Sequence, residues 1–585
     1  LFHIYGKQEN KRIYVLINES GKKSLIDFQS SDFVSISKYE EKLIDEGDFS
    51  NEANFSKRDF ILTRKRILGD FITAFELKTL GWQREGFFAF ANCVFFKGNI
   101  KNVNEYGIVN VEIEPTEKSE YFEEVKHYYS PAFSEIYKHT RDDDDPYEND
   151  RYFVFKKSPV TMDTWMKQMQ KVYNEKAIIG ISSVFFSLFR DLFVKTHAVS
   201  PLLFLSGEKG SGKSKYAESL ASLFTYKQPA FDLNGSTLVA FSRRIGRTRN
   251  AITLLEEFHD NIDLKILQSI KGSYDNRGRE LGMATGDNRT KVAKVNCFLV
   301  MLSQYLSSWD DNAITSRSVI QHFIKPQENF TQQEINEYNL LKSWEEEGLT
   351  SLVLDIVAHR EEVEKNYIKT YADIINRFKK DLKAHDYQER MLQNYVVIMT
   401  PITILWQHFN FPFEYEELYQ LCKNAIIDSS DLIIESEGLA EFWKTLEYLL
   451  DRQPYPLLVK DTHFIIDTPI GLKLQGRKGE KEIEWTNDQR KRVLFLRLNA
   501  VHQLYHKEVS TREGVDVIGE NTLRNYFKSK KYYIGAVKSK NFSDTSTSAY
   551  IFDYDMMEAS GILNLIRNKD NFNPEPSEAD DDLPY

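Results

Sequence analysis

Residues Gly207 to Ser214 read Gly-Glu-Lys-Gly-Ser-Gly-Lys-Ser, and they follow the apolar run Pro201-Leu-Leu-Phe-Leu205. This is the pattern G-x-x-x-x-G-K-[ST], placed between a predicted buried strand and a helix-like stretch that begins near Tyr216. The glycines let the backbone wrap around a polyphosphate, and the amide N–H groups of the loop and of the helix N-terminus point at anionic oxygens. The stretch therefore predicts a nucleotide site.

Within this loop, individual side chains have expected roles. Lys213 is expected to reach the β- and γ-phosphates of ATP, and the Ser214 hydroxyl is expected to bind Mg²⁺. The alternative is a glycine-rich turn without a ligand, which the flanking strand and helix signals disfavour. The predicted nucleotide-binding residues are Gly207, Glu208, Lys209, Gly210, Ser211, Gly212, Lys213, Ser214 and Lys215.

Length and composition describe a folded protein of several domains. The chain has 585 residues, of which 41% are hydrophobic and 13% aromatic. A net charge of −11 disfavours a generally basic nucleic-acid coat, so any DNA contact must come from local basic patches. The three cysteines are too scattered for a zinc site or a disulfide framework, which suits a reducing cytoplasm.

Membrane and targeting signals are also weak. The longest apolar runs, residues 178–189 and 395–406, are shorter than the about 20 residues that a membrane span needs. We therefore expect no membrane partner. The chain begins at Leu1 without a signal peptide or an initiator methionine, which leaves open that another segment, such as a primase, precedes it.

Changes in pattern along the chain predict a multidomain α/β protein. Residues 201–325 alternate strand and helix signals, which is typical of a parallel sheet. One helix is expected around residues 64–80 of an otherwise β-rich N-terminal region. The predicted division is a mixed β-rich domain at 1–158, a P-loop ATPase core at 159–328, a helical lid at 329–453, a turn-rich linker at 454–484, a small α/β unit at 485–560 and a disordered acidic tail at 561–585.

Two adjacent carboxylates follow a second predicted strand. The run Ala251-Ile-Thr-Leu-Leu ends in Glu256 and Glu257, at the carboxyl end of a strand, where α/β sheets place ligands. Hydrolysis of ATP needs one carboxylate near the magnesium shell and a base that orients water. We assign Glu256 to the Mg²⁺ shell and Glu257 to water activation. The alternative is a strand that ends in ordinary solvated acids.

Two further polar positions complete the predicted catalytic set. Phe298-Leu-Val-Met-Leu is followed by Ser303 and Gln304, either of which is expected to position the attacking water if this strand lies beside the first two. Arg317 follows a short turn and precedes another apolar run, as expected of an arginine that stabilises charge on the transferred phosphoryl group. The alternatives are a polar loop and a surface ion pair.

These motifs, in this order, resemble the core of AAA+ ATPases. The stretches 274–282 and 303–305 are more narrowly similar to superfamily 3 and minichromosome-maintenance-like helicases of phages and mobile elements, including primase-associated ones. Glu256-Glu257 departs conservatively from the Asp-Glu of many members. The resemblance implies a ring, usually a homo-hexamer, in which Arg317 acts on the ATP of a neighbouring subunit. A lid arginine normally completes such a site, and Arg390 is the candidate here.

A basic segment precedes the Ser303 strand. It contains five basic residues against two acids, Glu280 and Asp287, and a turn signal at Gly286 predicts a β-hairpin. In the resembling helicases a hairpin at this place projects into the ring channel, where basic side chains hold the DNA backbone. The alternative is a solvated basic loop. The basic residues are Arg277, Arg279, Arg289, Lys291 and Lys294.

Residues 490–540 carry 12 Lys or Arg and 4 Asp or Glu, although the whole protein is acidic. Helices are expected at 490–505, near 511–515 and from Leu523 to Lys530, and strands at 532–537 and 549–552. This order predicts a winged helix-turn-helix. The alternative is a unit that packs against the ring or another protein. The predicted phosphate contacts are Arg524, Lys528, Lys530 and Lys531.

The chain ends Asp580-Asp-Asp-Leu-Pro-Tyr585, which resembles the acidic tips of bacterial single-stranded-DNA-binding proteins. Such tips dock on replication proteins, and a plain solubilising tail is the alternative.

Taken together, the sequence predicts a cytoplasmic, ring-forming, ATP-dependent helicase that acts on single-stranded or forked DNA, with primase or other replication proteins as candidate partners. Two alternatives remain open: an AAA+ ATPase that remodels protein or acts in phage defence, and a nucleotide-switched origin-binding protein.

Overall fold

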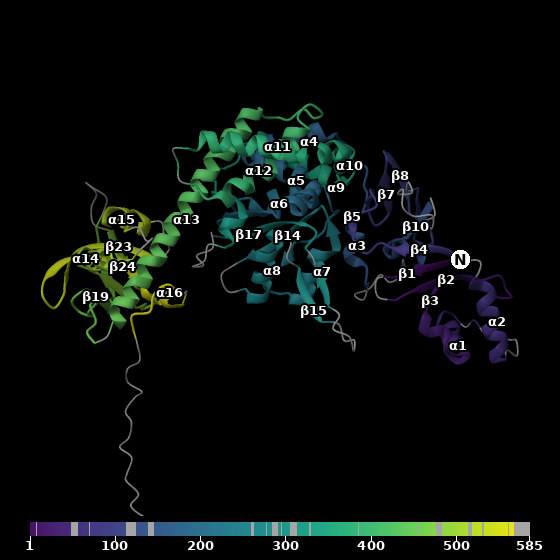
Figure 1. Cartoon of the computed structure of the whole chain (residues 1–585), viewed down its shortest axis with the longest axis horizontal. Helices are drawn as coiled ribbons and strands as arrows, with labels where there is room; N and C mark the ends of the chain where they lie inside the picture. The colour runs from purple at the N-terminus through teal and green to yellow at the C-terminus, as the bar shows by residue number, and fades with distance from the viewer. Residues whose placement is uncertain are drawn as a thin grey trace, which may run out of the picture. The chain divides into compact units, whose positions relative to one another are not determined.

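The computed structural model describes the chain apart from 7–8, 48, 50–55, 69–70, 113–124, 138–144, 259–261, 276–277, 283–289, 294, 305–312, 327–328, 384, 386, 453, 476–482, 513–516, 529, 531, 560 and 567–585. The chain divides into two compact units, the first ending at Ser430 and the second beginning at Asp431 (Figure 1).

Two sheets form the N-terminal part of the first unit. Their strands are β1 (Phe2–Tyr5), β2 (Lys11–Ile17), β3 (Lys23–Gln29), β4 (Ile72–Glu76), β5 (Leu80–Trp82), β6 (Phe88–Ala89), β7 (Cys93–Phe96), β8 (Asn99–Asn102), β9 (Ile108–Glu112), β10 (Val125–Tyr129) and β13 (Thr248–Arg249). The larger sheet has the order β3-β2-β1-β4-β10-β9, and the smaller has the order β13-β5-β6-β7-β8. The accompanying helices are α1 (Ile36–Asp45), α2 (Lys57–Leu68) and α3 (Glu148–Arg151).

The helix predicted over residues 64–80 is wrong beyond its first turn. Helix α2 ends at Leu68, and the stretch that follows forms β4 and β5. Apolar residues at Leu68, Phe71 and Phe75 imitate a helical spacing, but β4 pairs in parallel with both β1 and β10. Burial of Ala74 in that sheet overrides the local periodicity.

The parallel α/β sheet predicted from the alternating pattern is confirmed. Its order is β12-β14-β17-β11-β18, and every pairing is parallel. The predicted strands that lead into the phosphate loop, the carboxylate pair and Ser303 are all present as buried strands. The strands are β11 (Leu202–Gly207), β12 (Phe231–Asp232), β14 (Ile252–Phe258), β17 (Phe298–Ser303) and β18 (Ser318–Phe323).

Helix α5 is the centre of the core beside this sheet. Among the described residues it alone is long and apolar enough to cross a membrane, yet 89% of that window is buried inside the protein. Phe186 of α5 packs edge-to-face on Phe298 of β17 at 5.6 Å between ring centroids, so its apolar surface is used in packing. The helices around the sheet are α4 (Met162–Tyr173), α5 (Lys176–His197), α6 (Lys213–Ala221), α7 (Leu238–Arg247) and α8 (Leu264–Tyr274).

A buried arginine ties α5 to α8. Arg190 is 2% exposed and donates to the Ser200 hydroxyl (2.6 Å) and to the carbonyl oxygens of Ser273 and Val295 (both 3.0 Å). Burial lowers the pKa of Arg190 to about 10, so it remains charged at neutral pH. The Ser273 carbonyl belongs to the last turn of α8, where the helix dipole favours a cation.

The described residues from Gln332 to Asp451 are mostly helical, as predicted. The helices are α9 (Gln332–Glu347), α10 (Leu352–Val357), α11 (Arg360–Asp381), α12 (Glu389–Ile404) and α13 (Tyr415–Asp451), and α13 continues from the first unit into the second. In Figure 1, α5, α11 and α12 lie on one side of the parallel sheet, and α7 and α8 lie on the other.

The second unit has a four-stranded antiparallel sheet with the order β19-β22-β24-β23 and a separate pair, β20 with β21. Residues 454–484, which the sequence predicts as a linker, carry β19, β20 and the start of β21. The helix predicted from residue 490 begins only at Leu498, because the apolar run before it forms β22. The elements are β19 (Phe464–Asp467), β20 (Gly471–Leu474), β21 (Ile483–Thr486), β22 (Val493–Leu496), β23 (Tyr533–Asn541), β24 (Ser546–Asp553), α14 (Leu498–Val509), α15 (Glu520–Lys528) and α16 (Tyr554–Ala559).

In the predicted winged helix-turn-helix, α15 corresponds to the third helix and the pair β23–β24 corresponds to the wing. The second expected helix, near 511–515, falls mostly on residues 513–516, outside those described. The winged-helix assignment, the lid and the predicted domain boundaries stay predictions. The acidic tip at 580–585 also lies outside the described residues.

Replacing Arg190 with Met is expected to destabilise the first unit by roughly 2–5 kcal/mol, because two buried carbonyl groups lose a charged donor. Chemical denaturation measures this change. Arg243→Met is the matched control, since Arg243 is exposed on α7 and its loss should change stability by less than about 0.5 kcal/mol. Equal effects of the two substitutions would contradict the structural role of Arg190.

Candidate nucleotide site and nucleic-acid surfaces

The three glycines of the phosphate loop meet different steric demands. Gly207 ends β11 with a φ of 153°, and a Cβ atom there would lie 2.2 Å from the Phe323 carbonyl oxygen of β18. Gly210 and Gly212 have φ values of 85° and 88°, and added Cβ atoms would meet nothing within 4 Å. Gly207 therefore allows two strands to approach closely, whereas the other two shape an open concave loop.

Lys213 begins α6 and lies under this loop. Its side chain is buried, and Nζ donates to the Glu208 carbonyl oxygen at 3.3 Å. Burial lowers the pKa of Lys213, while the charges of Glu257 and Glu256 oppose that shift. The two carboxylates on β14 and Lys213 lie at the same carboxyl edge of the parallel sheet, and their charges interact.

Glu256 lies in a crowded group of acids. It is paired in register with Asp232 on β12. Burial raises the pKa of Glu256, and the nearby carboxylates of Glu218, Glu257 and Asp232 raise it further, with Lys215 acting in the opposite direction. Like charges held together in this way are stabilised by a bound cation.

Glu257 has an unusual backbone conformation. Its φ is 57°, in the left-handed region that residues other than glycine seldom adopt. The pairing of β14 with β17 shifts register between Leu255 and Phe258, and Asn234 Nδ2 donates to the Glu257 carbonyl oxygen at 3.0 Å. The bulge and this hydrogen bond hold a strained residue whose side chain is exposed at the sheet edge. No sequence signal pointed to Asn234.

The strand that carries Ser303 lies between β11 and β14. Ser303 is buried, and its hydroxyl donates to the Phe258 carbonyl oxygen at 2.9 Å, which links β17 to β14. Gln304 follows at the carboxyl end of β17 and is exposed. Of the two residues, Gln304 is therefore the one whose side chain is available at the edge that carries Lys213 and Glu257.

One loop hydroxyl is buried without a protein partner. Ser211 is 9% exposed, and its Oγ has no hydrogen-bond partner within the described part of the chain. Ser214 is half-buried in the first turn of α6. A nucleoside triphosphate with its divalent cation fits these features. The phosphates suit the open glycine loop, the Ser211 hydroxyl and the buried Lys213, and the cation suits the acids around Glu256.

Arg317 lies at the opposite edge of the same sheet. It belongs to a short 3-10 helix, Thr315–Arg317, that leads into β18. In the register of β18 with β11, Ser318 faces Leu202 and Phe323 faces Gly207. At about 3.3 Å per residue, five residues separate the two edges by roughly 16 Å, so Arg317 cannot complete the phosphate loop of its own chain.

Arg390 lies beside Arg317 and not beside Lys213. The guanidinium carbons of Arg317 and Arg390 lie 5.9 and 5.6 Å from the ring centroid of Tyr274, which is almost fully buried at the end of α8. Asn394, one turn along α12 from Arg390, donates to the carbonyl oxygens of Ser316 (3.1 Å) and Ser318 (3.2 Å). Tyr274 and Asn394 position the arginine segment, and the sequence reasoning missed both roles.

A cavity of about 420 Å³ opens beside Arg317. Its wall is formed by α7 and α8 and includes two lysines and one acid. The charged lining residues are Lys265, Lys271, Asp275 and Arg317. The lining of this cavity therefore carries three cations and one acid.

The predicted basic hairpin is partly described. Strand β15 (Arg279–Gly282) pairs antiparallel with β16 (Thr290–Ala293), so a hairpin follows α8 (Figure 1). Arg279 and Lys291 lie on these strands. The other three predicted contacts, Arg277, Arg289 and Lys294, lie outside the described residues. Roles of all five in DNA binding stay predictions.

Helix α15 presents only part of its predicted basic set. Leu523 and Phe527 are buried, and Lys528 is exposed, with Nζ 3.3 Å from Asn525 Oδ1. Arg524 forms an ion pair with Glu520 and lies over the Tyr550 ring at 5.8 Å. Lys530 is half-buried, and Lys531 lies outside the described residues.

The sequence matches no family model and no curated protein. Among solved structures, the active helicase Cch of SCCmec type IV covers 96% of this chain and 94% of its own, with a TM-score of 0.50 and 14% identity. A C-terminal region of NrS-1 covers 75% of this chain and 77% of its own, with a TM-score of 0.26 and 11% identity. JCV helicase covers 48% and 64%, with a TM-score of 0.20 and 9% identity. Of these three likenesses, the first supports a fold shared over nearly the whole chain.

Ser211→Ala is expected to leave the stability of the nucleotide-free protein within about 0.5 kcal/mol, because no hydrogen bond is lost. The gain in stability on adding Mg²⁺ and a non-hydrolysable ATP analogue should shrink, and thermal unfolding with and without that ligand measures both effects.

Ser206→Ala is the matched control. Ser206 Oγ is 3.1 Å from His322 Nδ1, so this substitution should cost about 1 kcal/mol without nucleotide. A full ligand-induced gain in Ser211→Ala would argue that its hydroxyl does not meet the phosphates.

Proposed function

We propose that this protein hydrolyses ATP and uses the energy to move along DNA as a helicase. The observation that carries the proposal is the placement of Lys213, Glu256 and Glu257 at the same edge of a parallel sheet that carries the open glycine loop. The likeness to a helicase over nearly the whole chain supports the assignment to helicases.

Each residue of the site has a proposed task. Backbone N–H groups of the loop and Lys213 bind the β- and γ-phosphates. Ser214 and Glu256 hold Mg²⁺, which supplies charge neutralisation on the phosphate oxygens when bound. Glu257 accepts a proton from the attacking water, and Gln304 orients that water from the neighbouring strand.

The position of Arg317 favours a multimer. Because Arg317 lies at the far edge of the sheet from its own phosphate loop, we propose that it acts on the nucleotide of a second copy. We propose a closed ring, with a homo-hexamer as the expected size and Arg390 contributing beside Arg317.

The DNA contacts are proposed from charge and placement. The β15–β16 hairpin carries Arg279 and Lys291, and α15 exposes Lys528. These cations are suited to phosphate contacts without base reading. We place the protein in the cytoplasm, in the replication of a phage or mobile element, with single-stranded or forked DNA as its substrate.

Lys213→Ala is expected to abolish ATP binding, and Glu257→Gln is expected to retain ATP binding but reduce hydrolysis at least 100-fold, because only the proton acceptor is lost. Nucleotide binding, phosphate release and strand displacement on a forked DNA measure these steps. Glu347→Gln, an exposed acid at the end of α9, is the matched control and should behave as wild type.

Three outcomes separate the alternatives. Hydrolysis without strand displacement would favour a protein-remodelling or defence ATPase. Intact DNA binding and origin function in Glu257→Gln would favour a nucleotide switch. Failure of the wild-type protein to bind any nucleotide with Mg²⁺ would overturn the proposal as a whole.

Mixing two inactive variants tests the shared site. Lys213→Ala lacks a working phosphate loop, and Arg317→Ala lacks the cation, so each is expected to be inactive alone. In mixed assemblies, an intact loop from one variant meets an intact arginine from the other, and ATP hydrolysis should reappear. A mixture that stays as inactive as its components, although light scattering shows mixed assemblies, would argue that Arg317 serves no neighbouring site.

A further inference from the structure

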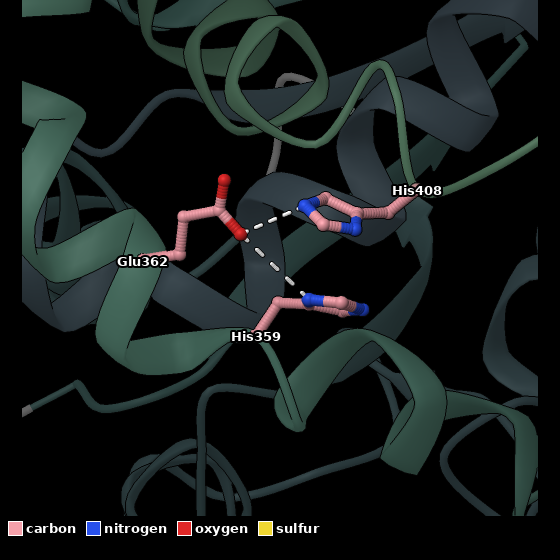
Figure 2. A group of neighbouring side chains, drawn as sticks. All are labelled: His359, Glu362 and His408. Atoms are coloured by element: carbon pink, nitrogen blue, oxygen red, sulfur yellow. Dashed lines mark ion pairs between the residues drawn. The ribbon is translucent and has the colours of Figure 1, made fainter.

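Two histidines and a glutamate meet where the start of α11 lies near the turn after α12, far along the chain from the phosphate loop (Figure 2). His359 immediately precedes α11, Glu362 lies in its first turn, and His408 follows the end of α12. One potential ligand atom from each residue lies within 4.8 Å of the other two. Glu362 Oε2 is 2.8 Å from His408 Nε2 and 3.8 Å from His359 Nδ1.

Contacts in the core fix both sides of this group. Arg360, the neighbour of His359, is 6% exposed. Its guanidinium group donates hydrogen bonds to the two Asp191 carboxylate oxygens at 2.6 and 3.0 Å. Phe409, the neighbour of His408, packs edge-to-face on Phe185 of α5 at 5.2 Å. The three side chains are therefore held near one another by packing that does not depend on their own ion pair.

The group has the chemistry of a metal site. In tetrahedral zinc sites, histidine nitrogens and carboxylate oxygens bind at about 2.0–2.2 Å, which places ligand atoms about 3.4 Å apart. The distance from Glu362 Oε2 to His408 Nε2, 2.8 Å, is shorter than this value, and the distance to His359 Nδ1, 3.8 Å, is longer.

We propose that His359, Glu362 and His408 bind a divalent transition-metal ion, with Zn²⁺ as the expected ion. The ion joins the start of α11 to the turn after α12, and a water molecule takes the fourth position. It serves as a structural clip within the helical region, and this role does not depend on the proposed ATPase activity.

The test is a Zn²⁺ titration of the full chain after removal of metals with a chelator. Excess Mg²⁺ is present to occupy the acidic nucleotide site. A chromophoric chelator competes for Zn²⁺, and thermal unfolding follows stability. The wild-type chain should bind one Zn²⁺ that His359→Ala, Glu362→Gln and His408→Ala each weaken by roughly 10-fold or more. The wild-type melting temperature should rise with Zn²⁺, and those of the variants should not.

His385→Ala is the matched control, because His385 is an exposed histidine in the connection between the same two helices. It should bind Zn²⁺ as the wild type does. Co²⁺ provides a second readout that does not depend on stability, since its visible absorption reports nitrogen and oxygen ligands in a tetrahedral site. Glu362→Gln keeps a polar side chain of similar size, so it tests ligation even if a histidine variant misfolds.

Three results would overturn the proposal. One is the absence of Zn²⁺ binding, and another is binding that the three substitutions leave unchanged. The third is equal weakening by His385→Ala, which would mean that Zn²⁺ binds to surface histidines in general.

Discussion

The arrangement of charges in the first unit depends on the parallel pairing of β11, β17 and β14. Parallel strands end at a common edge, and this edge receives the glycine loop, Gln304 and the two glutamates of β14. Lys213 is buried among these groups, and the two carboxylates favour its charge against the cost of burial. The left-handed conformation of Glu257 costs of order 1–3 kcal/mol, which the bulge in β14 and the Asn234 contact must offset. Such strain is typical of sites where side-chain direction matters more than stability.

The other edge of the same sheet carries Arg317 and Arg390. Tyr274 lies under the guanidinium groups of Arg317 and Arg390, and Asn394 binds the backbone on both sides of Arg317. Helix α12 therefore determines where this arginine points. A rotation of α12 against the sheet would move the carbonyl groups that flank Arg317, which offers a direct link between the helical region and the proposed neighbouring site.

Helix α12 also connects the two proposals. Arg390 and Asn394 lie in its first turns, whereas His408 follows its end, roughly 20 Å away at about 1.5 Å per residue. A metal ion held by His359, Glu362 and His408 would fix the far end of the helix whose near end holds Arg317. Arg360 fixes the start of α11 in the same region through its buried ion pair with Asp191. The contact between Arg360 and Asp191 of α5 thus attaches the helical region to the body of the first unit without nucleotide.

The sequence alone determined the local features of this protein. Periodicity and glycine chemistry identified β11, β14, β17 and the helices after residue 330, because hydrophobic spacing and tight turns are encoded by near neighbours. It failed at residues 71–82 and 490–497, where pairing with distant strands overrides helical spacing. Only the tertiary structure placed Glu256 and Glu257 beside Lys213, separated Arg317 from them, and revealed Asn234, Tyr274, Asn394 and the His359–Glu362–His408 group. These relations join residues far apart in the chain, and the free energy that sets them comes from packing and strand register, which no short window of sequence contains.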